Sequence, residues 1–170
     1  TFSVVANDST RDIVVITDYE VHGAAAVDTI TITGGIANVG TLSGVATVGV
    51  DTRVDLAPGA IVTRADGVTI ESFEVSATGL VTLYNSNLAV GTIDEVYAES
   101  DADIYAIMEA LTLLSGAPTA YTFEYDFNDD GTADGQIVAS DDFAGITNIV
   151  QLVGVTGAEL DAAADGIVLA

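Results

Sequence analysis

The chain has 170 residues, 49% of them apolar, so it is long enough to bury one sizeable core or two small ones and apolar enough to fold. Its 26 acidic residues stand against three arginines and no lysine, and the formal net charge of −23 argues against nucleic acid and anionic membrane surfaces as partners. The absence of cysteine excludes disulfides and thiolate chemistry, and no apolar run approaches the ~18 residues of a membrane-inserted helix.

Residues 1–98 read as a β-rich region. Asp28–Gly34 alternates polar and apolar residues as a half-buried strand does, and Ile13–Thr17 is a continuous apolar run suited to a strand buried on both faces. Gly, Asn and Asp interrupt the region about every eight to twelve residues, which favours a sandwich, a roll or a short solenoid. The other predicted strands are Phe2–Val5, Val45–Val50, Ala60–Thr63, Val68–Val75 and Leu80–Tyr84.

One amphipathic helix is predicted at about residues 100–115. Ser100 is suited to cap its first turn, with Asp103 in the capping-box position, and Gly116 and Pro118 end it. Such an apolar stripe normally covers one face of a sheet. The stripe consists of Ile104, Ile107, Met108, Leu111 and Leu114.

Residues 99–170 continue as a β-hairpin, with "AYTFEYDF" and "GQIVAS" as its strands, followed by a third strand around Ile149–Val153. The sequence "TGAE" is a second capping box and predicts a short C-terminal helix from Thr156 to about Ala163. We therefore expect a mainly β fold, an antiparallel sandwich, roll or short β-solenoid with two helices. Residues 1–98 and 99–170 are expected to pack as one continuous domain.

The turn of this hairpin, "YDFNDDGTADGQ", is the densest group of polar side chains in the sequence. It reads D-x-N-x-D-G-x-x-D, in which alternate oxygen ligands surround a glycine that permits a sharp turn, an arrangement that suits calcium. The alternative is a tight turn whose Asn, Asp and Gly residues serve backbone conformation alone. The predicted calcium ligands are the side chains of Asp126, Asn128, Asp130 and Asp134 and the carbonyl of Thr132.

The loop departs from an EF-hand at position 12, where a bidentate glutamate is replaced by Ile137, and strands are predicted on both sides in place of helices. A calcium ion held here needs a further carboxylate, for which Asp129, Asp141 and Asp142 are the sequence candidates.

Other chemistry finds little support. His22 is the single histidine and, with Tyr19, forms the pair on which haem or ligand binding depends. No G-x-S-x-G nucleophile elbow is present. Two carboxylates can serve a glycosidase, and Glu71/Glu74 and Asp94/Glu95 are pairs of this kind. So acidic a chain contains such pairs by necessity, and solvated surface carboxylates are the simpler interpretation. We expect no catalytic centre.

The order of features from about residue 100 onwards resembles the C-terminal regions of bacterial surface proteins of the repeats-in-toxin class, which leave the cell by type I secretion. The features are a helix, "YTFEY", "DFNDDGTADG", "DDF", "IVQLVGVTG" and a terminal "DGIVLA". The tandem glycine–aspartate nonapeptides of a calcium β-roll are absent. The resemblance implies an extracellular, calcium-associated structural protein and does not imply an enzyme.

We therefore expect a secreted structural protein that assembles with copies of itself into a cell-surface layer, such as an S-layer, or an extracellular filament. Thr1–Ala6 is apolar and uncharged, and is either tied into its own core or added as a strand to the sheet of a neighbour. Two alternatives stay open: a C-terminal secretion or capping domain of a larger secreted adhesin or enzyme, and a haem- or ligand-binding secreted protein.

Overall fold

The computed structural model describes residues 2–5, 12–19, 30–33, 38–39, 53–56, 58–76, 78–86, 94–115, 119–141, 146–158, 160–163 and 166–169. Within these ranges the chain forms fifteen strands and one helix, so the prediction of a mainly β fold is confirmed. The helix α1 spans Asp101–Ser115. The strands are β1 (Phe2–Val5), β2 (Asp12–Ile16), β3 (Ile30–Thr33), β4 (Asn38–Val39), β5 (Val54–Asp55), β6 (Val62–Thr63), β7 (Thr69–Ile70), β8 (Ser72–Val75), β9 (Leu80–Tyr84), β10 (Glu95–Val96), β11 (Thr119–Tyr125), β12 (Gly135–Asp141), β13 (Ile146–Val153), β14 (Leu160–Ala163) and β15 (Gly166–Leu169).

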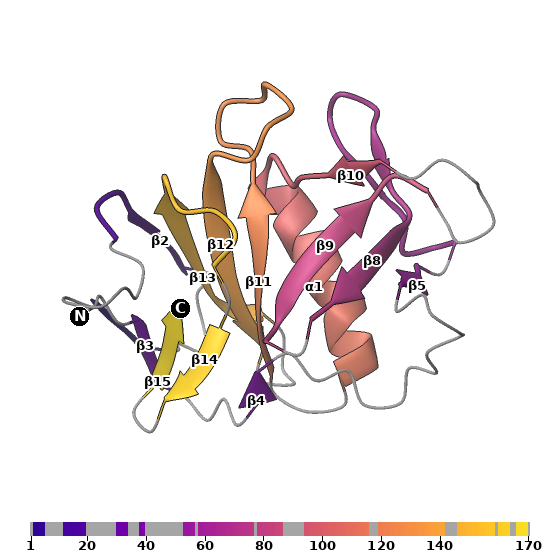
Figure 1. Ribbon diagram of the computed structural model, residues 1–170. Helices are drawn as coiled ribbons and strands as arrows, with labels where there is room; N and C mark the ends of the chain where they lie inside the picture. The colour runs from indigo at the N-terminus through magenta and orange to yellow at the C-terminus, as the bar shows by residue number, and fades with distance from the viewer. Residues whose placement is uncertain are drawn as a thin grey trace.

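A large mixed sheet organises the fold (Figure 1). Its strand order is β2-β13-β12-β11-β9-β8-β5, with β10 and β4 pairing β9 and β11. The predicted antiparallel arrangement holds for β11–β12–β13 and for β8–β9, whereas β11–β9 and β13–β2 run parallel. Strands from both sides of residue 98 therefore hydrogen-bond within one sheet.

Both faces of the central strands are covered. On one face Phe123 and Ile137 join a core with Met108 of α1. On the other face Val138 and Leu152 join a second core, whose partners come from a four-stranded sheet of order β1-β3-β15-β14. Successive residues of a strand point to opposite faces, so the alternation of large apolar residues along β11, β12 and β13 fills both cores.

The capping box predicted at the start of α1 is present. Ser100 Oγ accepts the N–H of Asp103 at 3.3 Å, and the Asp103 carboxylate accepts the N–H of Ser100 at 3.0 Å and its hydroxyl at 2.8 Å. Four of the five predicted stripe residues are buried, namely Ile104, Ile107, Met108 and Leu111. Among the described residues, no helix is long and apolar enough to span a membrane.

Two predictions about single elements are wrong. Leu160–Ala163 forms strand β14, paired with β15, in place of the predicted short C-terminal helix, because tertiary pairing overrides the local capping signal. β2 is buried on one face only, since Val15 is 55% exposed, and in the part of the chain that the structure describes β13 is its only neighbour. Val45–Val50 lies outside the described residues.

A buried side-chain amide ties the segment before β14 to the large sheet. Gln136, fully buried on β12, accepts the N–H of Ala158 at 3.0 Å and donates to the Ala158 carbonyl and, at 2.7 Å, to Thr122 Oγ1. The Thr122 hydroxyl in turn donates to the Ile137 carbonyl at 2.9 Å. Every polar atom in this group depends on another, because water does not reach it.

We predict that Gln136→Met lowers the free energy of unfolding by about 1–3 kcal/mol, since it leaves the Ala158 N–H and carbonyl buried without partners. Gln151→Met is the matched control, because the described hydrogen bond of the Gln151 amide goes to exposed Asp101 at 3.0 Å, where water can replace it. Urea denaturation of the two variants measures the difference, and equal losses would contradict the prediction.

Candidate functional site

The candidate site is the loop that joins β11 to β12, at the top of the molecule in Figure 1. Its base is closed by the Asp134 N–H, which donates to the Tyr125 carbonyl at 3.1 Å. The Phe127 ring packs against Tyr125 at this base, with the two ring centroids 4.5 Å apart. Gly135 is required there, because a Cβ at this position would lie 2.0 Å from the Phe127 ring.

The Asp126 carboxylate is the centre of the loop. It is 1% exposed and accepts four backbone N–H groups. Its Oδ1 accepts those of Asn128, Asp129 and Asp130 at 3.2, 2.7 and 3.3 Å. Its Oδ2 accepts that of Gly131 at 2.7 Å. The chain curls around one charge, and the N–H dipoles replace the water that the carboxylate has lost.

This curl requires left-handed backbone at two positions, Asp129 with φ 61° and Gly131 with φ 83°. Glycine adopts this conformation without steric cost, and aspartate tolerates it better than most residues. Gly131 therefore adopts the conformation of a sharp turn, as its position in the loop predicted.

The remaining predicted ligands surround the same turn. Asp134 Oδ1 accepts the Phe127 N–H at 2.7 Å, and its Oδ2 accepts from Asn128 Nδ2 at 2.8 Å. Asp130 is exposed, and its Oδ1 accepts the Thr132 N–H at 2.9 Å. The structure thus brings Asn128 and Asp134 into contact, whereas Asp130 caps the outer turn.

Among the described residues, these contacts do not assemble a complete cation cage. Each carboxylate oxygen carries two lone pairs, and Asp126 Oδ2 and both Asp134 oxygens accept one hydrogen bond each among the described contacts. Among the described residues, no group of three or more His, Cys, Asp or Glu side chains is arranged to hold a metal ion. Asp142 lies outside the described residues, and the side chain of Asp141 is not among those described.

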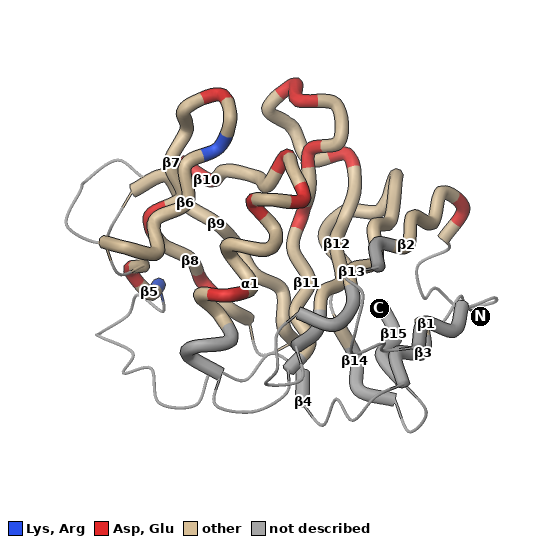
Figure 2. Tube along the Cα trace, turned by 180° about the vertical axis from the view of Figure 1, so that it is seen from behind, with Lys and Arg blue, Asp and Glu red and all other residues tan. Residues whose placement is uncertain are grey.

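The segment before α1 forms a hydrogen bond with the start of the loop. The Ala98 carbonyl accepts the Asp126 N–H at 3.1 Å, and Ala98 bridges Tyr125. The neighbouring residues of this segment are held by Arg64 of the β6–β7 turn, which donates to the Tyr97 carbonyl at 2.8 Å and pairs with Glu99. Figure 2 shows acidic residues of the β6–β7 turn, the start of α1 and the β11–β12 loop at the same end of the molecule.

Glu99 is the charged residue of this region that the sequence did not single out. Burial raises the pKa of its carboxyl to about 7; Arg64 opposes the shift, whereas Asp66, Asp129 and Asp126 add to it. Burial, and then nearby carboxylates led by that of Asp101, also raise the pKa of Tyr125. The end of the molecule that carries the loop thus has an excess of negative charge.

Within the described ranges, the other candidates from the sequence form no second site. Tyr19 is buried in the core shared by the two sheets, and His22, its proposed partner, lies outside the described residues. Glu71 and Glu74 accept hydrogen bonds from the hydroxyls of Thr69 and Tyr84 at 3.3 and 3.4 Å. Comparison with protein-family models, curated protein sequences and solved structures finds no match for this chain.

We predict that, with a chelator present, Asp126→Ala lowers the free energy of unfolding by about 3 kcal/mol, because four N–H groups lose a charged acceptor. Asp130→Ala is the control within the same loop and should cost clearly less, since Asp130 is exposed and accepts a single N–H there. Chemical denaturation of both variants decides, and a smaller loss for Asp126→Ala than for Asp130→Ala would refute a central role for Asp126.

A second prediction concerns pH. The pKa of Glu99 is about 7 in the folded protein, against an ordinary value of 4.5, so between these values the folded chain holds a proton that the unfolded chain has released. The contribution of Glu99 to the free energy of unfolding therefore falls as pH rises from about 4.5 to about 7. Glu99→Gln should remove this fall and Glu109→Gln should keep it, measured by denaturation in chelator across that range. Parallel pH profiles for Glu99→Gln and the unaltered chain would contradict the assignment.

Proposed function

We propose that this chain is a secreted structural protein that binds calcium in the β11–β12 loop and assembles with copies of itself into a cell-surface layer or filament. The observation that carries the proposal is the loop itself, in which the backbone curls around the buried Asp126 carboxylate and presents Asn128, Asp130 and Asp134 from one short segment. Asp130 and Asp134 each accept a backbone N–H, as Asp126 does, but asparagine can accept such bonds as well, so three negative charges are more than the turn requires.

Calcium binding uses the predicted ligands with small side-chain movements. Asp126 stays fixed by its N–H contacts, and the exposed Asp130 and the Asn128–Asp134 pair turn toward a cation beside it. Thr132 adds its carbonyl, and water completes the six to eight oxygens that calcium takes. The repulsion that Asp126 and Asp129 exert on the Glu99 carboxylate supports the same proposal, because a bound cation relieves it.

Assembly is proposed from charge and from free strand edges. Copies carrying −23 repel one another, and calcium or salt lowers that barrier. Among the described strands, β1 is at the edge of the four-stranded sheet and pairs in parallel with β3, with Phe2 opposite Ile30. Exchange of such a strand with a neighbouring copy has a low free-energy cost, because the strand loses one ladder of hydrogen bonds and forms an equivalent one.

Calcium titration tests the first half of the proposal. We expect binding heat by calorimetry and, at about 100 times the dissociation constant, a stabilisation of about 2.7 kcal/mol that a chelator reverses. The double variant Asp130→Asn with Asp134→Asn should lose both effects, while Glu109→Gln, which removes one exposed charge from α1, should keep them. A melting temperature that calcium leaves unchanged, together with no binding heat, would refute the calcium site.

Assembly is followed in the same samples by light scattering and electron microscopy. Polymers should form when calcium is added, and a chain that lacks residues 1–6 should bind calcium as before but remain monomeric. If the truncated chain polymerises equally well, exchange of β1 is wrong although calcium binding stands. If the intact chain stays monomeric at every calcium concentration, the assembly proposal fails.

A further inference from the structure

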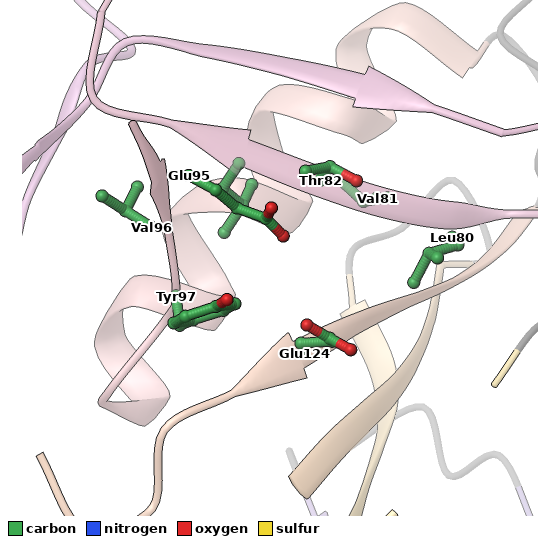
Figure 3. A pocket seen from close by; sticks show the side chains of 8 residues that line it. Leu80, Val81, Thr82, Glu95, Val96, Tyr97 and Glu124 are labelled. Carbon is green, nitrogen blue, oxygen red and sulfur yellow. The ribbon is translucent and has the colours of Figure 1, made fainter. Parts of the chain in front are cut away.

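A small pocket lies where the large sheet opens between β9 and β11 (Figure 3). β9 pairs with β11 only through Leu80 and Val81, and then pairs with β10 through Leu83 and Tyr84. The space between the diverging strands has a volume of about 100 Å³. A space of this size accommodates a small group of a few non-hydrogen atoms.

The walls of the pocket are of two kinds. Leu80 and Val96 contribute apolar surface, while Glu95 and Glu124 direct their carboxylates into the same space from β10 and β11. The structure gives neither carboxylate a hydrogen-bond donor or a cation among the described residues. Glu95 is an exposed residue and Glu124 is half-buried, so the pocket opens to solvent on the Glu95 side. Partial desolvation and then Glu124 raise the pKa of Glu95, and the two carboxylates thus place negative charge beside apolar surface.

Among the described residues, no lysine, arginine or histidine lines this pocket. The chain contains no lysine. Arg64 is engaged by Asp66 and Glu99, and the Arg53 guanidinium lies 5.5 Å from the ring centre of Tyr84. Neither of these arginines lines the pocket. The two arginines that the structure describes therefore leave this pair of carboxylates open to a positive group from another molecule.

We propose that this pocket binds a primary alkylammonium group, either of a free amine or at the end of a lysine side chain of another protein. The ammonium has three donors that point in different directions and reach carboxylates on two sides, while the alkyl stem lies on the apolar wall. A guanidinium suits one carboxylate in a planar fork, and calcium requires six to eight oxygens, more than two carboxylates beside apolar side chains provide. The proposal is independent of whether the β11–β12 loop takes calcium.

The test is an NMR titration of the ¹⁵N-labelled full chain with n-butylammonium chloride, at fixed ionic strength, once with chelator and once with calcium. Amide shifts should change at residues 80–83 and 95–97, and butan-1-ol, which lacks the charge, should bind at least about tenfold more weakly. Glu95→Gln and Glu124→Gln should each weaken binding by about tenfold. Glu109→Gln is the control and should leave the affinity unchanged.

A second titration with Nα-acetyl-lysine N-methylamide separates the two sources of the ligand. Equal affinity at the same amides shows that a lysine side chain of a protein can enter, whereas a response to butylammonium alone assigns the pocket to free amines. The proposal is overturned if the shifts scatter over the acidic surface, if butan-1-ol binds as well as the amine, or if both glutamine variants bind like the unaltered chain.

Discussion

The scarcity of cations is the constraint on which the described structure depends. A carboxylate that leaves water needs a partner, and three arginines cannot serve 26 acids. The chain uses its own backbone instead. Asp126 accepts four N–H groups, and Asp103 accepts those of Glu99 and Ser100 at 3.3 and 3.0 Å. In both cases a negative charge shapes the local backbone, closing the β11–β12 loop or starting α1.

Arg64 also pairs with carboxylates, and it connects two separate elements, whereas the N–H contacts of Asp126 and Asp103 act within one local segment. It joins the β6–β7 turn to the segment that precedes α1, whose Ala98 carbonyl holds Asp126. The candidate calcium loop therefore rests on a chain of contacts that begins at a single guanidinium. The surroundings of the loop are predominantly negative, which favours a cation there and disfavours an anion.

Local patterns predicted local structure well. Leu80–Tyr84, the hairpin strands and the Ser100–Asp103 cap follow from periodicity and turn chemistry, and the structure contains each of them. The loop residues were identified by their spacing, but the dominant role of Asp126 as an acceptor of N–H groups was not. Features that need distant partners were missed, namely the exposed face of β2, strand β14, the Arg64–Glu99 pair and the pocket between β9 and β11. Each depends on which remote segment arrives beside it, and periodicity carries no such information.

The pairing of β2 with β13 has a consequence for the order in which the chain folds. Asp12 lies opposite Asn148, so β2 pairs with a strand that is far from it in the sequence. Closing so long a loop is entropically costly and slows folding. The pairing stabilises the chain only after the whole segment from β2 to β13 has been made. A polypeptide that emerges from a ribosome or a narrow channel with its amino terminus first would leave β2 without this partner until β13 has followed.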